Sequence, residues 1–184
     1  DPQLIEELMT AAGHPHARST AHHELVCRRY VTLLAGELER GRARTRLLDG
    51  VEGLLDELDR RGDVLLGLLT GNLAEGAALK LQAAGLDPSR FRVGAYGSDA
   101  AERSRLPALA ARRATPILGR EVAGNDLVII GDTPADVTCG QSLAARAIGV
   151  ATGFYSRTDL LAAGAFAAFD SFAAPEPVLA AIYA

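Results

Sequence analysis

The chain has 184 residues, 48% of them hydrophobic and 23% charged, and its formal net charge is −4 at pH 7. A chain of this length and apolar content can bury one core, with or without a modest attachment. No Lys/Arg cluster stands clear of neighbouring acids, so nothing favours a nucleic-acid partner. No apolar run reaches the roughly 20 residues of a membrane span, and no signal-peptide pattern opens the chain.

The two cysteines, Cys27 and Cys139, lie far apart in the chain and lack the spacing of a metal site. Two free thiols in a reduced compartment are the simplest interpretation. We therefore expect a cytoplasmic protein. No pattern in the sequence indicates an oligomeric state.

Residues 1–46 carry only helical patterns. Apolar residues at helical spacing predict a first helix that Gly13 can end and a second helix that begins near Ser19. The segment HPHARSTAHH carries all four histidines of the chain. His22 and His23 are adjacent, so on a helix they would point about 100° apart and would form no two-ligand metal face. A solvated loop and helix start is a better interpretation of this segment than a metal site.

From Leu47 onward, predicted helices and strands alternate. The apolar run from Val64 to Leu69 has the length of a buried parallel strand, and so has the run LVII before Gly131. This rhythm predicts a doubly wound, Rossmann-like α/β fold with a parallel sheet, whose ligand site lies at the carboxyl ends of the strands. The expected helices cover 51–60, 73–84, 103–114, 134–145, 157–163 and the chain from 176, and the expected strands lie within 64–69, 91–98, 126–132, 147–152 and 166–172.

The loop LLTGN leaves the first of these strands with polar groups that suit an anion. Thr70 stands at the strand end, Gly71 follows, and Asn72 opens a helix. The Thr70 hydroxyl, the amides after it and the positive end of the helix together predict an anion site. The alternative is structural, with Asn72 and Glu75 as an N-x-x-E capping pair.

The loop GDTPAD follows the strand LVII and carries two carboxylates four residues apart. A capping box explains part of it, with Thr133 as the N-cap, Pro134 as the first helical residue and Asp136 as the third-position acid. Asp132 is left unexplained, because an ionised carboxylate beyond a buried strand is costly unless a cation or donors meet it. Two such loops at one edge of a sheet favour a functional site over two caps.

With LLTGN followed about sixty residues later by VIIGDTPAD, the chain resembles the haloacid dehalogenase (HAD) superfamily at its second and fourth motifs. Most members of that superfamily are Mg-dependent phosphatases. The resemblance covers the whole chain. Residues 1–46 resemble part of the helical cap of the phosphoglycolate-phosphatase-like branch, and residues 47–184 resemble its α/β core.

The resemblance implies roles for both loops. Thr70, with Gly71 and Asn72, would bind the transferring phosphoryl group. Asp132 would ligate Mg²⁺, and Asp136 would support the metal directly or through water.

The third motif of the family is a Lys or Arg that neutralises the nucleophile and the phosphate, and its usual K-P-x-P pattern is absent here. The resemblance points to Arg103 at a helix start, with Arg105 as the second choice. Lys80 is disfavoured, because it lies about two turns down the helix after Asn72, roughly 10 Å or more from the anion site.

The first motif, D-x-D-x-T, supplies the aspartate nucleophile and the acid/base aspartate, and it is absent from residues 1–184. The nearest imitation, LLDGVEG, has Val51 where the second aspartate has to stand. In this family the first strand is central, between the strands that end in Thr70 and Asp132. Without it, backbone groups of both neighbours would go unpaired at roughly 1–3 kcal/mol each. We therefore expect a further N-terminal segment of several tens of residues, and a gap of roughly 9–10 Å between the flanking strands.

The resemblance implies a Mg-dependent phosphomonoester phosphatase that acts on a small soluble phosphate ester through an aspartyl-phosphate, under a cap that excludes water. Two alternatives stay open. A 2-haloacid dehalogenase shares the fold but has no use for the paired acids of GDTPAD. A non-catalytic scaffold would account for the absent D-x-D.

Overall fold

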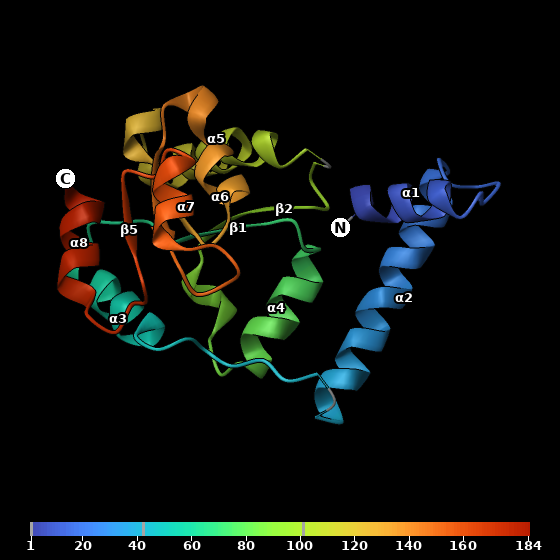
Figure 1. The fold of residues 1–184 in the computed structure, drawn as a ribbon. Coiled ribbons are helices and arrows are strands. Elements are labelled where there is room, and N and C mark those ends of the chain that lie inside the picture. The colour runs from blue at the N-terminus through green and yellow to red at the C-terminus, as the bar shows by residue number, and fades with distance from the viewer. Residues whose placement is uncertain (1, 42, 101) are drawn as a thin grey trace.

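The computed structural model describes residues 2–41, 43–100 and 102–184 and shows an α/β fold in which helices flank parallel strands (Figure 1). Residues 1 and 42 of the predicted helical region 1–46 lie outside this description. The α-helices are α1 (Pro2–Ala11), α2 (Thr20–Glu39), α3 (Val51–Arg61), α4 (Ala74–Ala83), α5 (Leu106–Leu118), α6 (Pro134–Thr138), α7 (Arg157–Ala162) and α8 (Pro175–Tyr183). The strands are β1 (Gly67–Thr70), β2 (Val93–Tyr96), β3 (Val128–Gly131), β4 (Arg146–Val150) and β5 (Ala167–Phe169).

The strands form two parallel groups. β1 pairs with β2, with Gly67 opposite Val93 and Thr70 opposite Tyr96. β3 pairs with β4, and β4 pairs with β5. The predicted α/β fold with parallel pairing is confirmed. Among the described residues, β1 and β3 are not hydrogen-bonded neighbours, which agrees with the expectation of a further strand between them.

Burial separates the strand that has two neighbours from the strands that have one. β4 lies between β3 and β5, and it is buried from Ala147 to Val150. No residue of β1 or β3 is buried to that degree, and Ile130 is 36% exposed. The expectation that LVII is a fully buried strand is therefore wrong for the chain that the structure describes. The physical reason is that one edge of β3 has no partner strand to cover it.

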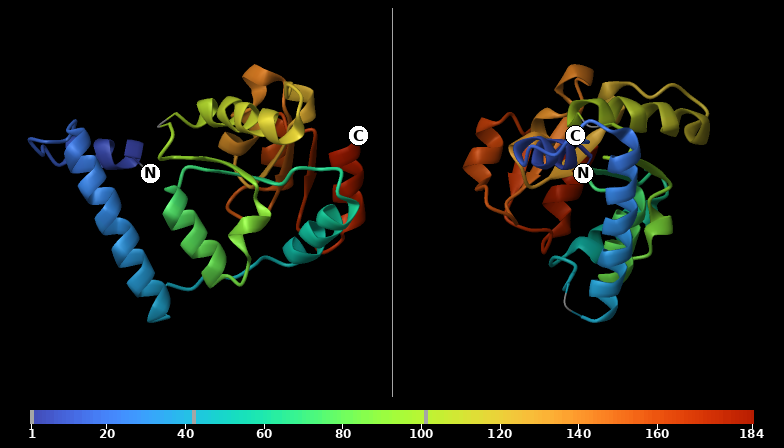
Figure 2. Two further views of the ribbon diagram at one scale, coloured as in Figure 1. Left: turned by 180° about the vertical axis from the view of Figure 1, so that it is seen from behind. Right: turned by 90° about the vertical axis from the view of Figure 1, so that its right-hand side faces the viewer.

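The helices α1 and α2, which we call the helical lobe, lie to one side of the core in Figure 1 and in the left view of Figure 2. No residue of α2 is buried. The lobe meets the core on α4, where a Cβ atom at Gly76 would lie 3.3 Å from a ring carbon of Tyr30 and 3.6 Å from Leu34. The missing side chain of Gly76 thus lets α2 approach α4 closely. The assignment of this lobe as a cap domain stays a prediction.

Two apolar clusters hold the core together, and each fully buried Leu or Val side chain in them contributes about 1.5–3 kcal/mol. The first joins α6, β4, α7 and β5, and its buried members are Val137, Ala147, Leu160, Ala165 and Ala168. The second joins α3 and α8, and its buried members are Leu54, Leu58, Val178 and Leu179. The first cluster anchors the loop at the end of β3, because α6 packs against β3 and β4.

Several elements differ from their predicted bounds. The helix expected over 103–114 is α5 at Leu106–Leu118, preceded by a 3-10 turn over Arg103–Arg105. β1 begins at Gly67 rather than Val64. α6 ends at Thr138 instead of about residue 145, and a short 3-10 helix follows over Gln141–Leu143. Gly140 and the left-handed backbone of Ala144, with φ of 56°, interrupt the predicted helix.

In the part of the chain that the structure describes, no helix is both long and apolar enough to cross a bilayer.

Candidate functional site

The loop after β1 is organised around the Thr70 hydroxyl. Thr70 Oγ1 accepts one hydrogen bond from the Asn72 backbone N at 3.1 Å and one from Asn72 Nδ2 at 3.0 Å. The N-cap of α4 is Leu73, and no side chain caps the helix. The N-x-x-E capping alternative is therefore wrong. One of the amides expected to meet an anion is also engaged, because Asn72 N points back to Thr70.

Lys80 reaches this loop from the second turn of α4. Its Nζ donates to Asn72 Oδ1 at 3.0 Å, and both side chains are partly buried. The distance argument against Lys80 is therefore wrong. Helical side chains lean toward the helix N-terminus, so a long lysine covers most of the rise that separates its backbone from the loop.

Gly97 joins the turn after β2 to the loop after β1. Its N–H donates to Asn72 O at 2.9 Å. A Cβ atom at position 97 would collide with the carbonyl oxygen of Gly71. Only glycine permits this approach, and the Thr70 loop is consequently held from both sides.

The loop after β3 forms the predicted capping box. Thr133 Oγ1 accepts from Asp136 N at 3.2 Å, while Asp136 Oδ2 accepts from Thr133 N at 3.1 Å and from Thr133 Oγ1 at 2.7 Å. Asp136 is only 7% exposed. Its role as a metal ligand stays a prediction, and one of its oxygens is occupied by the cap.

Asp132 differs sharply from Asp136. It is half-buried at the end of β3 and makes no hydrogen bond or ion pair with any described residue. Gly153, in the loop after β4, provides its space, since a Cβ atom there would clash with Asp132 Oδ2. An unpartnered, partly desolvated carboxylate is unfavourable by itself, so this group is suited to receive a cation.

Arg103 is the cation of this second loop. Its Nη2 donates to Asp136 Oδ1, and its Nε is buried without a partner among the described residues. Arg105 is exposed and makes no hydrogen bond or ion pair with the described residues of the loop, so the structure brings Arg103 rather than Arg105 to it. Thus each predicted loop carries one basic side chain, Lys80 on the first and Arg103 on the second.

Between the two loops lie the residues that follow β2, and they are fixed by an ion pair to α5. Asp99 accepts from Tyr96 N at 2.9 Å and from Arg113 Nη1 and Nη2 at 2.7 and 2.8 Å. The hydrogen bonds from the Arg113 guanidinium hold the pKa of Asp99 below its ordinary value, with a smaller contribution from Tyr96 N.

Cys139 lies beneath the second loop and is buried. Its Sγ donates to Asp136 O at 3.2 Å. Burial raises the pKa of the thiol, against a smaller opposing effect of Arg103. Both cysteines are free, as predicted, and Cys139 packs as a buried thiol beneath the loop.

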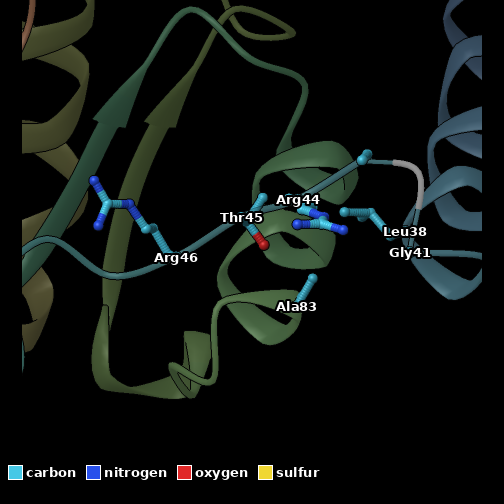
Figure 3. Close-up of a pocket in the computed structure, with 7 residues that line it drawn as sticks. Leu38, Gly41, Arg44, Thr45, Arg46 and Ala83 are labelled. Carbon is cyan, nitrogen blue, oxygen red and sulfur yellow. The ribbon is translucent and has the colours of Figure 1, made fainter.

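A cavity of about 570 Å³ lies elsewhere, at the joint between α2 and the core (Figure 3). Arg44, Thr45 and Arg46 line it together with Leu38 and Ala83. In Figure 3, Arg46 extends away from Arg44, so their charges do not converge on one anion. The cavity includes none of the predicted site residues.

The histidine segment forms a ring cluster. The His16 and His22 rings stack with centroids 4.2 Å apart, and His14 lies 5.8 and 6.2 Å from them. Within the described ranges, no group of three His, Cys, Asp or Glu residues is arranged to hold a metal ion. Residues 15–18 form turns and α2 begins at Thr20, which agrees with the predicted loop and helix start.

Comparison with known proteins identifies the class. Residues 100–175, which include Arg103, Asp132 and Asp136, match the family described as HAD-hydrolase-like. None of the curated proteins compared with the chain matches it. This match over part of the chain, together with the fold, confirms the resemblance to HAD-like hydrolases that the two motifs indicated.

Three solved structures illustrate the fold. A hydrolase from Pseudomonas syringae is 19% identical with a TM-score of 0.66, and the match covers 89% of this chain and 74% of that one. A predicted phosphatase from Clostridium acetobutylicum is 25% identical with a TM-score of 0.58, covering 72% and 59%. CbbY from Rhodobacter sphaeroides in complex with phosphate is 24% identical with a TM-score of 0.63, covering 83% and 63%. The chain thus spans less than two thirds of the length of the last two.

Several contacts were missed by sequence reasoning. Lys80 was set aside on distance, and neither Gly97 nor Gly153 was assigned a role. One signal was available: Lys80 is the single lysine of a chain that has eighteen arginines. A lysine differs from an arginine in its compact ammonium group, so this one exception was a signal that the position has a specific contact.

Proposed function

We propose that the protein is a Mg-dependent phosphatase that hydrolyses a small soluble phosphomonoester. The observation that carries the proposal is a pair of loops with opposite polarity. The loop after β1 offers the Thr70 hydroxyl as a donor, and the loop after β3 offers the unpartnered Asp132 carboxylate as an acceptor. A bound phosphate ester needs a hydrogen-bond donor for its phosphoryl oxygens, and the divalent cation bound with it needs a carboxylate ligand.

Thr70 would bind the transferring phosphoryl group. Both hydrogen bonds at its oxygen are accepted, so the hydroxyl proton is left for a phosphoryl oxygen. Gly71 and Asn72 would shape this phosphate site, and Lys80 Nζ donates to the Asn72 side chain.

Asp132 would be the chain's main Mg²⁺ ligand, because its carboxylate oxygens are the hard ligands that Mg²⁺ prefers and no protein donor occupies them. Asp136 would act through the loop and through water, since its oxygens already accept from Thr133 and Arg103. When bound, the ion would supply charge stabilisation for the phosphoryl oxygens. Further ligands have to come from outside the described cluster, because two carboxylates do not complete a site.

Arg103 would fill the third-motif role. Its guanidinium is anchored on Asp136, and its partner-less Nε adds a donor that no described residue uses. Positive charge held beside the phosphate stabilises the transition state without reorganising during the reaction.

The nucleophile would come from a strand between β1 and β3 that lies outside residues 1–184. Support for this comes from the open edges of both strands and from the absence of D-x-D in the sequence. An aspartate there would form the aspartyl-phosphate, and a second aspartate would protonate the leaving alcohol and then activate water. The helical lobe would act as the cap that excludes bulk water from the phosphoenzyme.

Two solved neighbours support a small phosphate ester as the substrate class. CbbY from Rhodobacter sphaeroides was solved with xylulose-(1,5)bisphosphate as well as with phosphate. Another neighbour is described as a predicted phosphoglycolate phosphatase from Haemophilus somnus. We extend from these only the class of substrate, a small phosphate ester.

Turnover of an aryl phosphate by the full-length protein tests the proposal. We expect hydrolysis with Mg²⁺ and none with a chelator, and we expect the 184-residue chain alone to be inactive. Halide release from 2-haloacids without Mg²⁺ would favour the dehalogenase instead. Complete inactivity of the full-length protein would leave the non-catalytic scaffold.

A further inference from the structure

Lys80 donates to a side-chain amide rather than to a carboxylate. Its Nζ lies 3.0 Å from Asn72 Oδ1, and the lysine is partly buried on α4. An ammonium group has three donors and no acceptor. Only the oxygen of the Asn72 amide can face it, so the lysine selects one of the two orientations of that amide.

The orientation of the amide decides what the Thr70 hydroxyl can do. With Oδ1 toward Lys80, Nδ2 faces Thr70 and donates to Oγ1 at 3.0 Å, alongside the backbone N of Asn72 at 3.1 Å. These two bonds use both lone pairs of the hydroxyl oxygen. The hydroxyl proton then has no acceptor among the described residues and is available to a ligand.

Without the ammonium group, the amide is free to turn over. Its oxygen would then face Thr70 Oγ1 and accept the hydroxyl proton. The backbone of the loop would be unchanged, because Gly97 N still holds Asn72 O at 2.9 Å. The loop would nevertheless lose its outward donor.

We infer that Lys80 is a positioning residue, which acts through Asn72 to hold the Thr70 hydroxyl as a donor toward an anion at the end of β1. The inference rests on the proposed function, in which that anion is the phosphoryl group of the substrate. It differs from direct charge neutralisation by Lys80. A lysine that acts through Thr70 has no effect once the hydroxyl is gone, whereas a lysine that acts on the anion directly keeps its effect.

A double-mutant cycle in the full-length protein separates the two roles. Thr70→Val, Lys80→Met and the double variant are compared with the wild type by kcat and KM on an aryl phosphate at saturating Mg²⁺. We expect Lys80→Met to lower kcat about 10–100-fold, close to the effect of losing one transition-state donor. The double variant should be no slower than Thr70→Val. Effects that multiply in the double variant would overturn the inference.

Two further variants distinguish positioning from a general loss of structure. Lys80→Arg should keep most of the activity, because a guanidinium is also a donor without an acceptor. Gln82→Met is the matched control, an exposed position on the same helix, and it should leave kcat unchanged. Equal losses in Lys80→Arg and Lys80→Met, with both proteins folded by circular dichroism, would contradict the inference.

Calorimetric binding of inorganic phosphate gives a readout that does not depend on turnover. Thr70→Val and Lys80→Met should weaken phosphate binding to a similar degree, and the double variant should weaken it no further. A wild type that lacks Mg-dependent turnover would refute the proposed function, and the binding cycle would still decide the role of Lys80. Unchanged phosphate affinity in Lys80→Met, or no binding by the wild type, would refute the inference.

Discussion

The two loops that end β1 and β3 are built alike and finish with opposite chemistry. Each carries a basic side chain from a neighbouring helix or turn, Lys80 on Asn72 and Arg103 on Asp136. In the first loop Lys80 donates to the side-chain amide of Asn72, and the Thr70 hydroxyl proton has no acceptor among the described residues. In the second loop Arg103 pairs with the Asp136 carboxylate, and the carboxylate of Asp132 has no partner among the described residues.

In each loop, one polar residue is fully bonded within the protein and another keeps an unused donor or acceptor. Asn72 and Asp136 have their polar atoms satisfied within the protein, so they organise their loops. Thr70 and Asp132 each retain one unused capacity, a proton to donate and lone pairs to offer. Polar groups without a partner inside the protein are therefore the candidates for binding a ligand.

The largest expected effect comes from removing the acceptor. Asp132→Asn should abolish most Mg²⁺ binding and with it nearly all Mg-dependent turnover, because it takes a full charge from a divalent cation site. Calorimetric Mg²⁺ titration and turnover of the full-length protein measure this. Asp170→Asn, an exposed acid at the end of β5, is the control. Unchanged Mg²⁺ affinity in Asp132→Asn would contradict the role of Asp132 as the chain's main Mg²⁺ ligand.

Removing the donor should cost less. Thr70→Val should lower kcat about 100-fold while leaving Mg²⁺ affinity nearly unchanged, because only a hydroxyl that meets the phosphoryl oxygens is lost. Thr70→Ser keeps the hydroxyl and should retain most activity. A large loss of Mg²⁺ binding in Thr70→Val would show that the two loops do not divide the work in this way.

Arg103→Met tests whether the second cation is structural as well as functional. It leaves the mostly buried Asp136 carboxylate without its ion pair, so we expect a loss of about 1–3 kcal/mol in the free energy of unfolding. Urea denaturation measures it. Arg105→Met, at the exposed neighbouring position, should change stability by less than about 0.5 kcal/mol. Equal stability of both variants would contradict the assignment.

The smallest expected effect concerns the segment between the loops, and it depends on pH. The pKa of Asp99 is lowered in the folded state by Arg113, so its contribution is present above the unfolded pKa of about 3.9 and is lost as pH falls through the lower folded value. Asp99→Asn should therefore cost about 0.5–1 kcal/mol near pH 6, and the difference from wild type should shrink below about pH 4. A difference that stays constant from pH 6 to pH 3 would contradict the ion pair.

Much of the fold could be predicted from the sequence, because apolar runs and glycine signals are local. The parallel pairing and the capping box of Thr133 and Asp136 both followed from such patterns. The short α6 and the half-open β3 did not, because they depend on how the backbone packs and on which strand edges have partners.

The sequence could indicate candidate site residues only where they directly follow an apolar strand. Thr70 and Asp132 were singled out from their places after apolar runs, and their roles stay predictions, whereas the Lys80 contact was missed. That contact depends on the direction of a long side chain, which spacing along a helix does not specify. Gly153 was missed for a similar reason, because its neighbour Asp132 is close only in space.

The open edges of β1 and β3 also bear on how the protein is made in the cell. A strand that fills the space between them needs both, and they lie about sixty residues apart in the chain. If that strand is synthesised first, translation at roughly 5–20 residues per second leaves it waiting about 7–26 s before residue 131 appears. Throughout that interval unpaired backbone is available to other extended chains, so early association with a chaperone would protect the nascent protein from aggregation.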